Sequence, residues 1–136
     1  MFSHILLPIA DDQGETTDRA LALAARLRAE GGKLTLLHVV EAIPSYVLSQ
    51  IPGKVLEEGR KSVQETLDRI AARSGGGAET AIIKGHGGDS ITRYAEEHGV
   101  DAIVITSHRP EFQDVFFGST AAHVVRHAPC SVMVLR

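Results

Sequence analysis

The chain has 136 residues, of which 43% are hydrophobic and 23% are charged. This composition is typical of a single folded globular domain and excludes a disordered chain. Fourteen Lys and Arg against seventeen Asp and Glu give a net charge of -3, which argues against the dense basic surface that non-specific nucleic-acid binding requires.

An apolar run near the start of the chain, His4–Ala10, predicts the first strand. Apolar residues then recur at helical spacing between positions 20 and 27, with Thr16 or Thr17 as the expected helix cap and Gly31-Gly32 as the expected stop. The nearly continuous apolar stretch Leu34–Val40 predicts a second strand that is covered on both faces.

The second strand contains a histidine, His38, which we expect to be a core residue rather than a ligand. Residues 41–53 carry two prolines and little periodicity, so they predict a mobile loop. An apolar face at helical spacing predicts a long amphipathic helix within residues 54–73. The three glycines 75–77 precede a strand, and therefore predict a connector rather than a phosphate loop.

A short third strand is expected over Glu79–Lys84, with Asp89 as the N-cap of a helix over Ser90–His98. The glycines between these elements do not form a dinucleotide-binding loop, because Ser90 stands where the last glycine is needed. No lysine follows for a P-loop either.

The strongest sign of a binding site lies in the C-terminal third. The β-branched run Ala102–Thr106 predicts a buried strand, and the loop after it ends at Gly118-Ser119, where apolar residues at i, i+3, i+4 and i+7 begin a helix. We expect Ser119 to be its N-cap. Such a start presents unpaired N–H groups and the positive end of the helix dipole, which favour an anion such as phosphate. The alternative is that Gly118 and Ser119 only cap the helix.

Two features of the C-terminal end bear on partners. Ser131–Leu135 is an apolar, uncharged strand expected at a sheet edge, which predicts a homodimer through this strand, with a tetramer left open. His123 and His127 are four residues apart, a spacing that suits a metal, but the acidic partner and third ligand are missing. We therefore expect a surface pair and no metal site.

The alternation of strands and helices predicts an α/β fold. We expect one domain over residues 1–136, with an open, doubly wound, parallel five-stranded sheet and helices on both faces. In such sheets ligands bind at the carboxyl ends of the strands, where the winding changes direction.

Two stretches carry a family resemblance: Gly88-Asp-Ser-Ile-Thr-Arg-Tyr-Ala-Glu-Glu-His-Gly-Val-Asp-Ala-Ile-Val104, and Thr106-Ser-His-Arg109 followed by Gly118-Ser-Thr-Ala-Ala-His-Val-Val-Arg-His-Ala-Pro129. The chain resembles the universal stress protein family. The resemblance implies a Rossmann-like, adenine nucleotide alpha hydrolase-like fold, with the first and fourth strands adjacent. It also implies a loop, written G-x-x-G, nine residues, then G-S or G-T, that wraps the phosphates of ATP.

This chain departs from that pattern at three positions. Thr106 and Arg109 replace the two glycines, and eight residues separate Arg109 from Gly118. Ala10 replaces an Asp that faces the adenosine in the family, with Asp11 just beyond. The Ser-His-Arg-Pro loop is similar to that of small bacterial members that still take adenine nucleotides.

The resemblance implies a binding site with three parts. The ends of the first two strands would lie beside the adenosine, Thr106 and Ser107 beside the ribose, and the start of the last helix beside the phosphates, with Arg109 directed toward the same charge. The predicted site residues are Pro8, Ile9, Ala10, Asp11, Val39, Thr106, Ser107, His108, Arg109, Gly118, Ser119, Thr120 and Ala121.

The expected function is binding of ATP, or of ADP or AMP, with or without Mg²⁺, by a stress-response or signalling module. The alternatives are a nucleotide-free dimeric interaction module and a slow nucleotide hydrolase. We assign no catalytic residue, because the chain lacks the P-loop lysine of efficient phosphoryl transfer. We expect a cytoplasmic protein, because the chain has a lone cysteine, Cys130, and no signal-peptide pattern. We also expect that it does not enter membranes, because no apolar run approaches roughly 20 residues.

Overall fold

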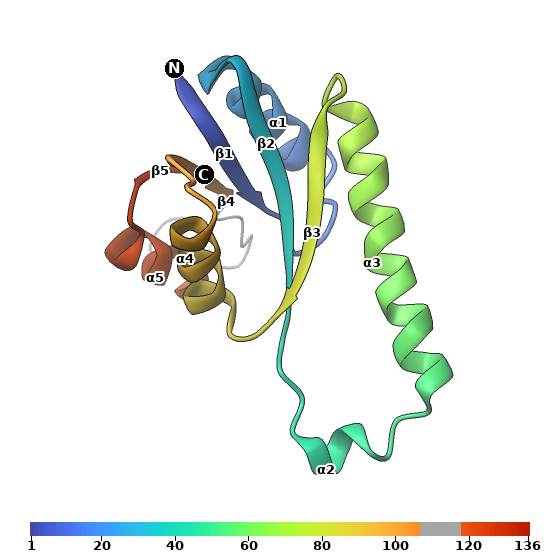
Figure 1. The fold of residues 1–136 in the computed structure, drawn as a ribbon. Helices are drawn as coiled ribbons and strands as arrows, with labels where there is room; N and C mark the ends of the chain where they lie inside the picture. Colours follow the sequence, from blue (N-terminus) through green and yellow to red (C-terminus); the bar gives the residue numbers. More distant parts are fainter. Residues whose placement is uncertain (107–117) are drawn as a thin grey trace.

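The chain folds into a five-stranded parallel sheet with the strand order β3-β2-β1-β4-β5 (Figure 1). The computed structural model describes residues 1–106 and 118–136. The strands are β1 (Phe2–Pro8), β2 (Arg28–Val40), β3 (Ala78–Lys84), β4 (Ala102–Thr106) and β5 (Ser131–Leu135).

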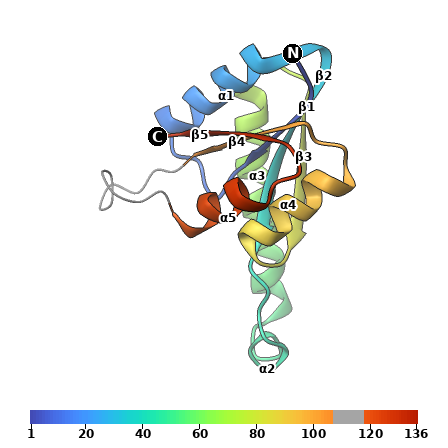
Figure 2. The same ribbon diagram turned by 90° about the vertical axis from the view of Figure 1, so that its left-hand side faces the viewer.

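Helices cover both faces of this sheet (Figures 1 and 2). α1 and α3 pack on one face, whereas α4 and α5 pack on the other. α2 is short and lies beyond the end of the sheet, where it joins β2 to α3 (Figure 2). The helices are α1 (Glu15–Leu27), α2 (Ser45–Leu48), α3 (Gly53–Arg73), α4 (Gly87–Glu97) and α5 (Ser119–His127).

Neighbouring residues of each central strand enter different cores, because side chains alternate across a strand. Leu36 belongs to the core under α1 and α3, and Leu37 to the core under α4 and α5; both are at most 1% exposed. On β4, Val104 likewise belongs to the core under α1 and α3, and Ile105 to the core under α4 and α5. The apolar runs seen in the sequence are thus explained by a sheet that is buried on both faces.

β1 is the strand at which the winding changes direction. It pairs with β2 on one side and with β4 on the other, where Ile5 lies opposite Ala102 and Leu6 opposite Ile103. The expected doubly wound α/β fold, with the first and fourth strands adjacent, is therefore confirmed. The carboxyl ends of β1 and β4 diverge toward different helices and leave room for a ligand between them.

The opposite end of the sheet is held by a polar cluster. The Asp101 carboxylate accepts hydrogen bonds from the backbone N–H groups of Ser3 and His4, each at 2.9 Å. Burial raises the pKa of Asp101, but these hydrogen bonds outweigh it and hold the pKa below its ordinary value. The buried His4 ring lies 2.8 Å from the Thr35 hydroxyl through Nε2. The cluster fixes β1 against β2 and β4 at the end away from the candidate site.

The first helix begins and ends differently from the sequence expectation. Gly14, at φ 58°, holds the cap position of α1, and the Thr17 hydroxyl instead accepts a hydrogen bond from the Gln13 N–H. Gly31 and Gly32 lie inside β2 rather than stopping the helix. Gly31 has φ 75°, a backbone conformation that glycine tolerates at an irregular position in a strand because it has no Cβ.

Two predicted N-caps are also displaced by one to three residues. α4 begins at Gly87, so Asp89 lies within its first turn and pairs with Arg93. α5 begins at Ser119, with Gly118 in the cap position and no side-chain cap. Residues 41–53, expected to be a loop, contain the single turn of α2.

Candidate functional site

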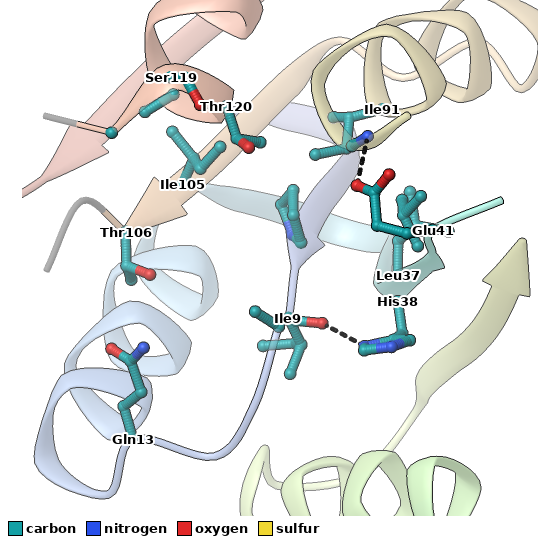
Figure 3. Close-up of a pocket in the computed structure, with 16 residues that line it drawn as sticks. Ile9, Gln13, Leu37, His38, Glu41, Ile91, Ile105, Thr106, Ser119 and Thr120 are labelled. Carbon is teal, nitrogen blue, oxygen red and sulfur yellow. Dashed lines mark hydrogen bonds between the residues drawn. The ribbon is translucent and has the colours of Figure 1, made fainter. Parts of the chain in front are cut away.

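A cavity of about 380 Å³ lies at the carboxyl ends of β1, β2 and β4, between the first turns of α4 and α5 (Figure 3). It occupies the crevice where ligands bind in open α/β sheets, and its volume suits a small organic molecule. The lining residues are Pro8, Ile9, Ala10, Gln13, Leu37, His38, Val39, Glu41, Gly87, Ile91, Ile105, Thr106, Gly118, Ser119, Thr120 and Ala121.

One part of the cavity wall is apolar. Leu37 from β2, Ile91 from α4 and Ile105 from β4 belong to the same buried cluster, and each is at most 4% exposed. They are fixed by packing between the sheet and two helices, so this wall is formed without a ligand. A wall of this kind suits a planar apolar group such as an aromatic ring.

The start of α5 forms a polar part of the wall. The first hydrogen bond at this end of the helix runs from the Ala122 N–H to the Gly118 carbonyl at 3.0 Å. The N–H groups of Ser119, Thr120 and Ala121 therefore have no acceptor within the helix. Together with the helix dipole they favour an anion at this edge of the cavity.

The start of α4 also faces the cavity, but it already has an anion. The Gly87 N–H donates a hydrogen bond to Glu41 Oε1 at 3.3 Å (Figure 3). His86 Nδ1 lies 3.6 Å from Glu41 Oε2. A Cβ added to Gly87 would lie 3.4 Å from Thr120 Oγ1, so the two helix starts are close neighbours. At Gly88 the added atom would lie 2.7 Å from His123 Cβ, and glycine is therefore needed for this close approach.

The segment after β1 is held by two sets of contacts. The Ile9 carbonyl accepts a hydrogen bond from His38 Nδ1 at 2.8 Å (Figure 3). Asp12 pairs with both terminal nitrogens of Arg73, at 2.8 and 3.0 Å, while Arg73 Nε binds Asp18. The Arg73 hydrogen bonds hold the pKa of Asp12 below its usual value. These contacts hold the segment after β1 against β2 and α3.

The structure brings most of the predicted site residues to this one cavity. Asp11 is an exception, because it lines a separate cavity of about 260 Å³ beside α3. Ser107, His108 and Arg109 lie outside the described residues. The predicted residues that line the main cavity are Pro8, Ile9, Ala10, Val39, Thr106, Gly118, Ser119, Thr120 and Ala121.

Sequence reasoning missed several lining residues. His38 was expected in the core, yet it is half-buried at the end of β2 and lines the cavity. The two-residue alternation of β2 and β4 contained a signal for Leu37 and Ile105, which lie on the same face as Val39. The other missed residues, Gln13, Glu41, Gly87 and Ile91, come from loops and helix starts whose positions depend on the tertiary fold.

The described part of the chain contains neither a cluster of metal-ligating side chains nor a membrane-spanning helix. No group of three or more His, Cys, Asp or Glu side chains there is placed to hold a metal ion. The rings of His123 and His127 lie 4.5 Å apart as a tilted pair. None of the described helices combines the length and the apolar character needed to cross a bilayer.

Comparison with known proteins places the chain in a family. The sequence model of the "Universal stress protein family" matches residues 1–136. "Universal stress protein G" of Shigella flexneri is 30% identical over 142 residues, with all of both chains covered. A Thermus aquaticus protein, "Universal stress protein in QAH/OAS sulfhydrylase 3'region", is 30% identical over 139 residues, again over the full length of both chains.

Solved structures agree with these matches. Universal stress protein UspA from Lactobacillus plantarum is 28% identical with a TM-score of 0.69, over 98% of this chain and 97% of that one. A universal stress protein from Archaeoglobus fulgidus in complex with dAMP is 22% identical (TM-score 0.67, coverage 97% and 96%). An Arabidopsis thaliana family protein with AMP bound is 20% identical (TM-score 0.62, coverage 98% and 90%). At this level of identity, the similarity to the dAMP and AMP complexes shows a shared fold and nothing more. The chain belongs to the universal stress protein family.

Proposed function

We propose that this protein binds an adenine nucleotide, either ATP, ADP or AMP, and acts as a stress-response or signalling module of the cytoplasm. The observation that carries the proposal is the cavity between α4 and α5, where an apolar wall lies beside the open start of a helix. A nucleotide needs both features at once, because its base is flat and weakly polar whereas its phosphate is an anion. Structures of the same fold hold AMP and dAMP, which agrees with a ligand of this size.

In the proposed complex the base lies against Val39 and the neighbouring apolar wall, and Thr106 faces the ribose. The phosphate lies at Gly118, Ser119 and Thr120, where the N–H groups at the start of α5 can donate to it. Ala10 presents no carboxylate at the end of β1, so the base would be held mainly by packing and by backbone groups.

Mg²⁺ would enter this site together with the phosphates. The ion is usually held by one or two carboxylates, substrate phosphates and water, and Glu41 is the one carboxylate among the described lining residues. These residues include no Lys or Arg. Any hydrolysis of ATP is therefore expected to be slow, since efficient phosphoryl transfer needs cationic groups and a positioned water.

The test of the proposed function is direct. Purified protein, denatured by heat and analysed by ion-exchange chromatography, should release AMP, ADP or ATP, and emptied protein should bind the same nucleotide in a calorimetric titration. Ser119→Ala should weaken binding by about twofold to tenfold, because it removes one hydroxyl hydrogen bond of about 0.5 to 1.5 kcal/mol. Absence of nucleotide in both experiments would favour the alternative of a nucleotide-free interaction module.

We also propose that two copies of the chain pair through β5. This strand is at an edge of the sheet, where β4 is its one partner among the described residues, and Met133 is 45% exposed. Residues Ser131–Leu135 carry no charge, whereas the opposite edge strand β3 includes Glu79 and Lys84. An uncharged edge is prone to association, and a two-fold copy would extend the sheet across the axis. A pair of such dimers would give a tetramer.

Light scattering at micromolar concentration should report a mass of at least two chains. Met133→Lys should shift the protein toward the monomer, because it places like charges close together across the two-fold axis. Val55→Lys is the matched control, since Val55 is also exposed but lies on α3. A monomeric wild-type protein, or a Met133→Lys variant that stays dimeric, would contradict pairing through β5.

A further inference from the structure

The described lining of the cavity lacks a permanently positive side chain. Its single carboxylate is Glu41, and it contains no Lys or Arg. An anionic ligand would therefore meet one negative side chain and, from these residues, only neutral donors. The position of that carboxylate decides how strongly it acts on the ligand.

The Glu41 carboxylate lies at the start of α4, a helix N-terminus that faces the cavity. Its Oε1 accepts the Gly87 N–H, so its charge lies at the positive end of that helix dipole (Figure 3). The position of an added Gly87 Cβ is 3.7 Å from Oε1 and 3.4 Å from Thr120 Oγ1. Glu41 Oε1 and Thr120 Oγ1 are thus at most about 7 Å apart, which is within the Debye length of about 8 Å at physiological salt.

We infer that, where no Mg²⁺ bridges Glu41 and the ligand, Glu41 is a charge-selecting residue, which reserves the start of α5 for a single phosphate and disfavours adenine nucleotides with longer phosphate chains. Its carboxylate takes the α4 helix start that a second phosphate would otherwise use, and it repels negative charge across the cavity. The favoured ligand class is the adenosine monophosphate. This inference rests on the proposed function and adds a preference among nucleotides to it.

The effect of the Glu41 charge on nucleotide affinity depends on the distance between Glu41 and the start of α5 and on the exposure of the Glu41 side chain. Two unit charges about 7 Å apart in an effective dielectric of 20 to 80 change an affinity by about threefold to fiftyfold. The Glu41 side chain is 68% exposed, so the weaker end of this range applies. Because AMP carries fewer charges than ATP, removal of the Glu41 charge should improve ATP binding more than AMP binding.

Calorimetric titrations of adenosine, AMP and ATP into wild-type protein, Glu41→Gln and Glu96→Gln in metal-free buffer test the inference. For Glu41→Gln we expect unchanged affinity for adenosine, a gain of about threefold to tenfold for AMP, whose phosphate carries between one and two charges, and a larger gain for ATP. The gains should shrink in 0.5 M salt because of screening. Glu96 is an exposed glutamate at the other end of α4, so Glu96→Gln controls for the loss of one negative charge.

The results of these titrations separate failure of the inference about Glu41 from failure of the proposed function. An equal gain for all three ligands, no gain for any, or the same gains in Glu96→Gln would overturn the inference and leave the proposed function standing. Absence of binding by wild-type and both variants would overturn both. Thermal unfolding confirms that the variants are folded, and Glu41→Lys, which reverses the charge, should increase the ATP gain beyond that of Glu41→Gln.

Discussion

Gly118→Val should reduce nucleotide affinity by about 100-fold or more while leaving the fold intact. Gly118 lines the cavity at the cap position of α5. Its φ of -38° and ψ of 162° lie outside the positive-φ region that favours glycine, so valine tests space rather than backbone conformation. A valine side chain would fill the place proposed for the phosphate. Two lost hydrogen bonds to a charged group, at about 1.5 to 3 kcal/mol each, correspond to at least this loss of affinity.

Gly59→Val is the matched control for this prediction. Gly59 is on α3, where an added Cβ would meet no atom within 4 Å, so the substitution adds the same side chain away from the cavity. Calorimetric titration with AMP and ATP measures both variants, and circular dichroism confirms their secondary structure. Wild-type affinity in Gly118→Val would exclude the start of α5 as the phosphate site.

The positions of the buried strands could be predicted from sequence because one physical rule governs their composition. Parallel strands that are buried on both faces need nearly continuous apolar runs, and β2 and β4 contain such runs over Leu34–Val40 and Ala102–Thr106. The order of the strands was not contained in these runs. The family resemblance implied only that the first and fourth strands are adjacent, and the pairing of β1 with β4 confirms this adjacency.

Helix boundaries were less predictable, because several residues near each start can serve as caps. Thr16, Thr17, Asp89 and Ser119 all satisfy the cap preference, yet the chain places glycine or histidine in the cap positions. At α4 the helix starts two residues before Asp89, and Glu41 supplies the acceptor for the Gly87 N–H. A partner 46 residues away in the chain cannot be seen in a local pattern.

The same reasoning explains which parts of the candidate site were predictable. The start of α5 is a local feature, and Ser119 was named from it, whereas Ile9 and Val39 were named from the family resemblance. Glu41 and His38 act through contacts with α4 and β1, which only the tertiary structure brings to the cavity. Neither residue could therefore be assigned to the cavity from local sequence.

Leu36→Ala and Leu37→Ala should each lower the free energy of unfolding by about 2 to 5 kcal/mol, because both remove a buried leucine. Leu36 is 0% exposed in the core under α1 and α3, and Leu37 is 1% exposed in the core under α4 and α5. Domains of this size are stable by about 5 to 15 kcal/mol, so both losses are large. Urea unfolding followed by circular dichroism measures them.

The two variants should differ in nucleotide binding although they are neighbours in the chain. Leu37 lines the cavity, so its truncation removes apolar contact with the bound base and should weaken binding by about tenfold, whereas Leu36 faces the opposite helices. Calorimetric titration under conditions in which both variants are folded separates the two effects. Equal affinities would mean that the base does not touch the α4 side of the sheet, because the alternation of β2 leaves Leu36 no access to the cavity.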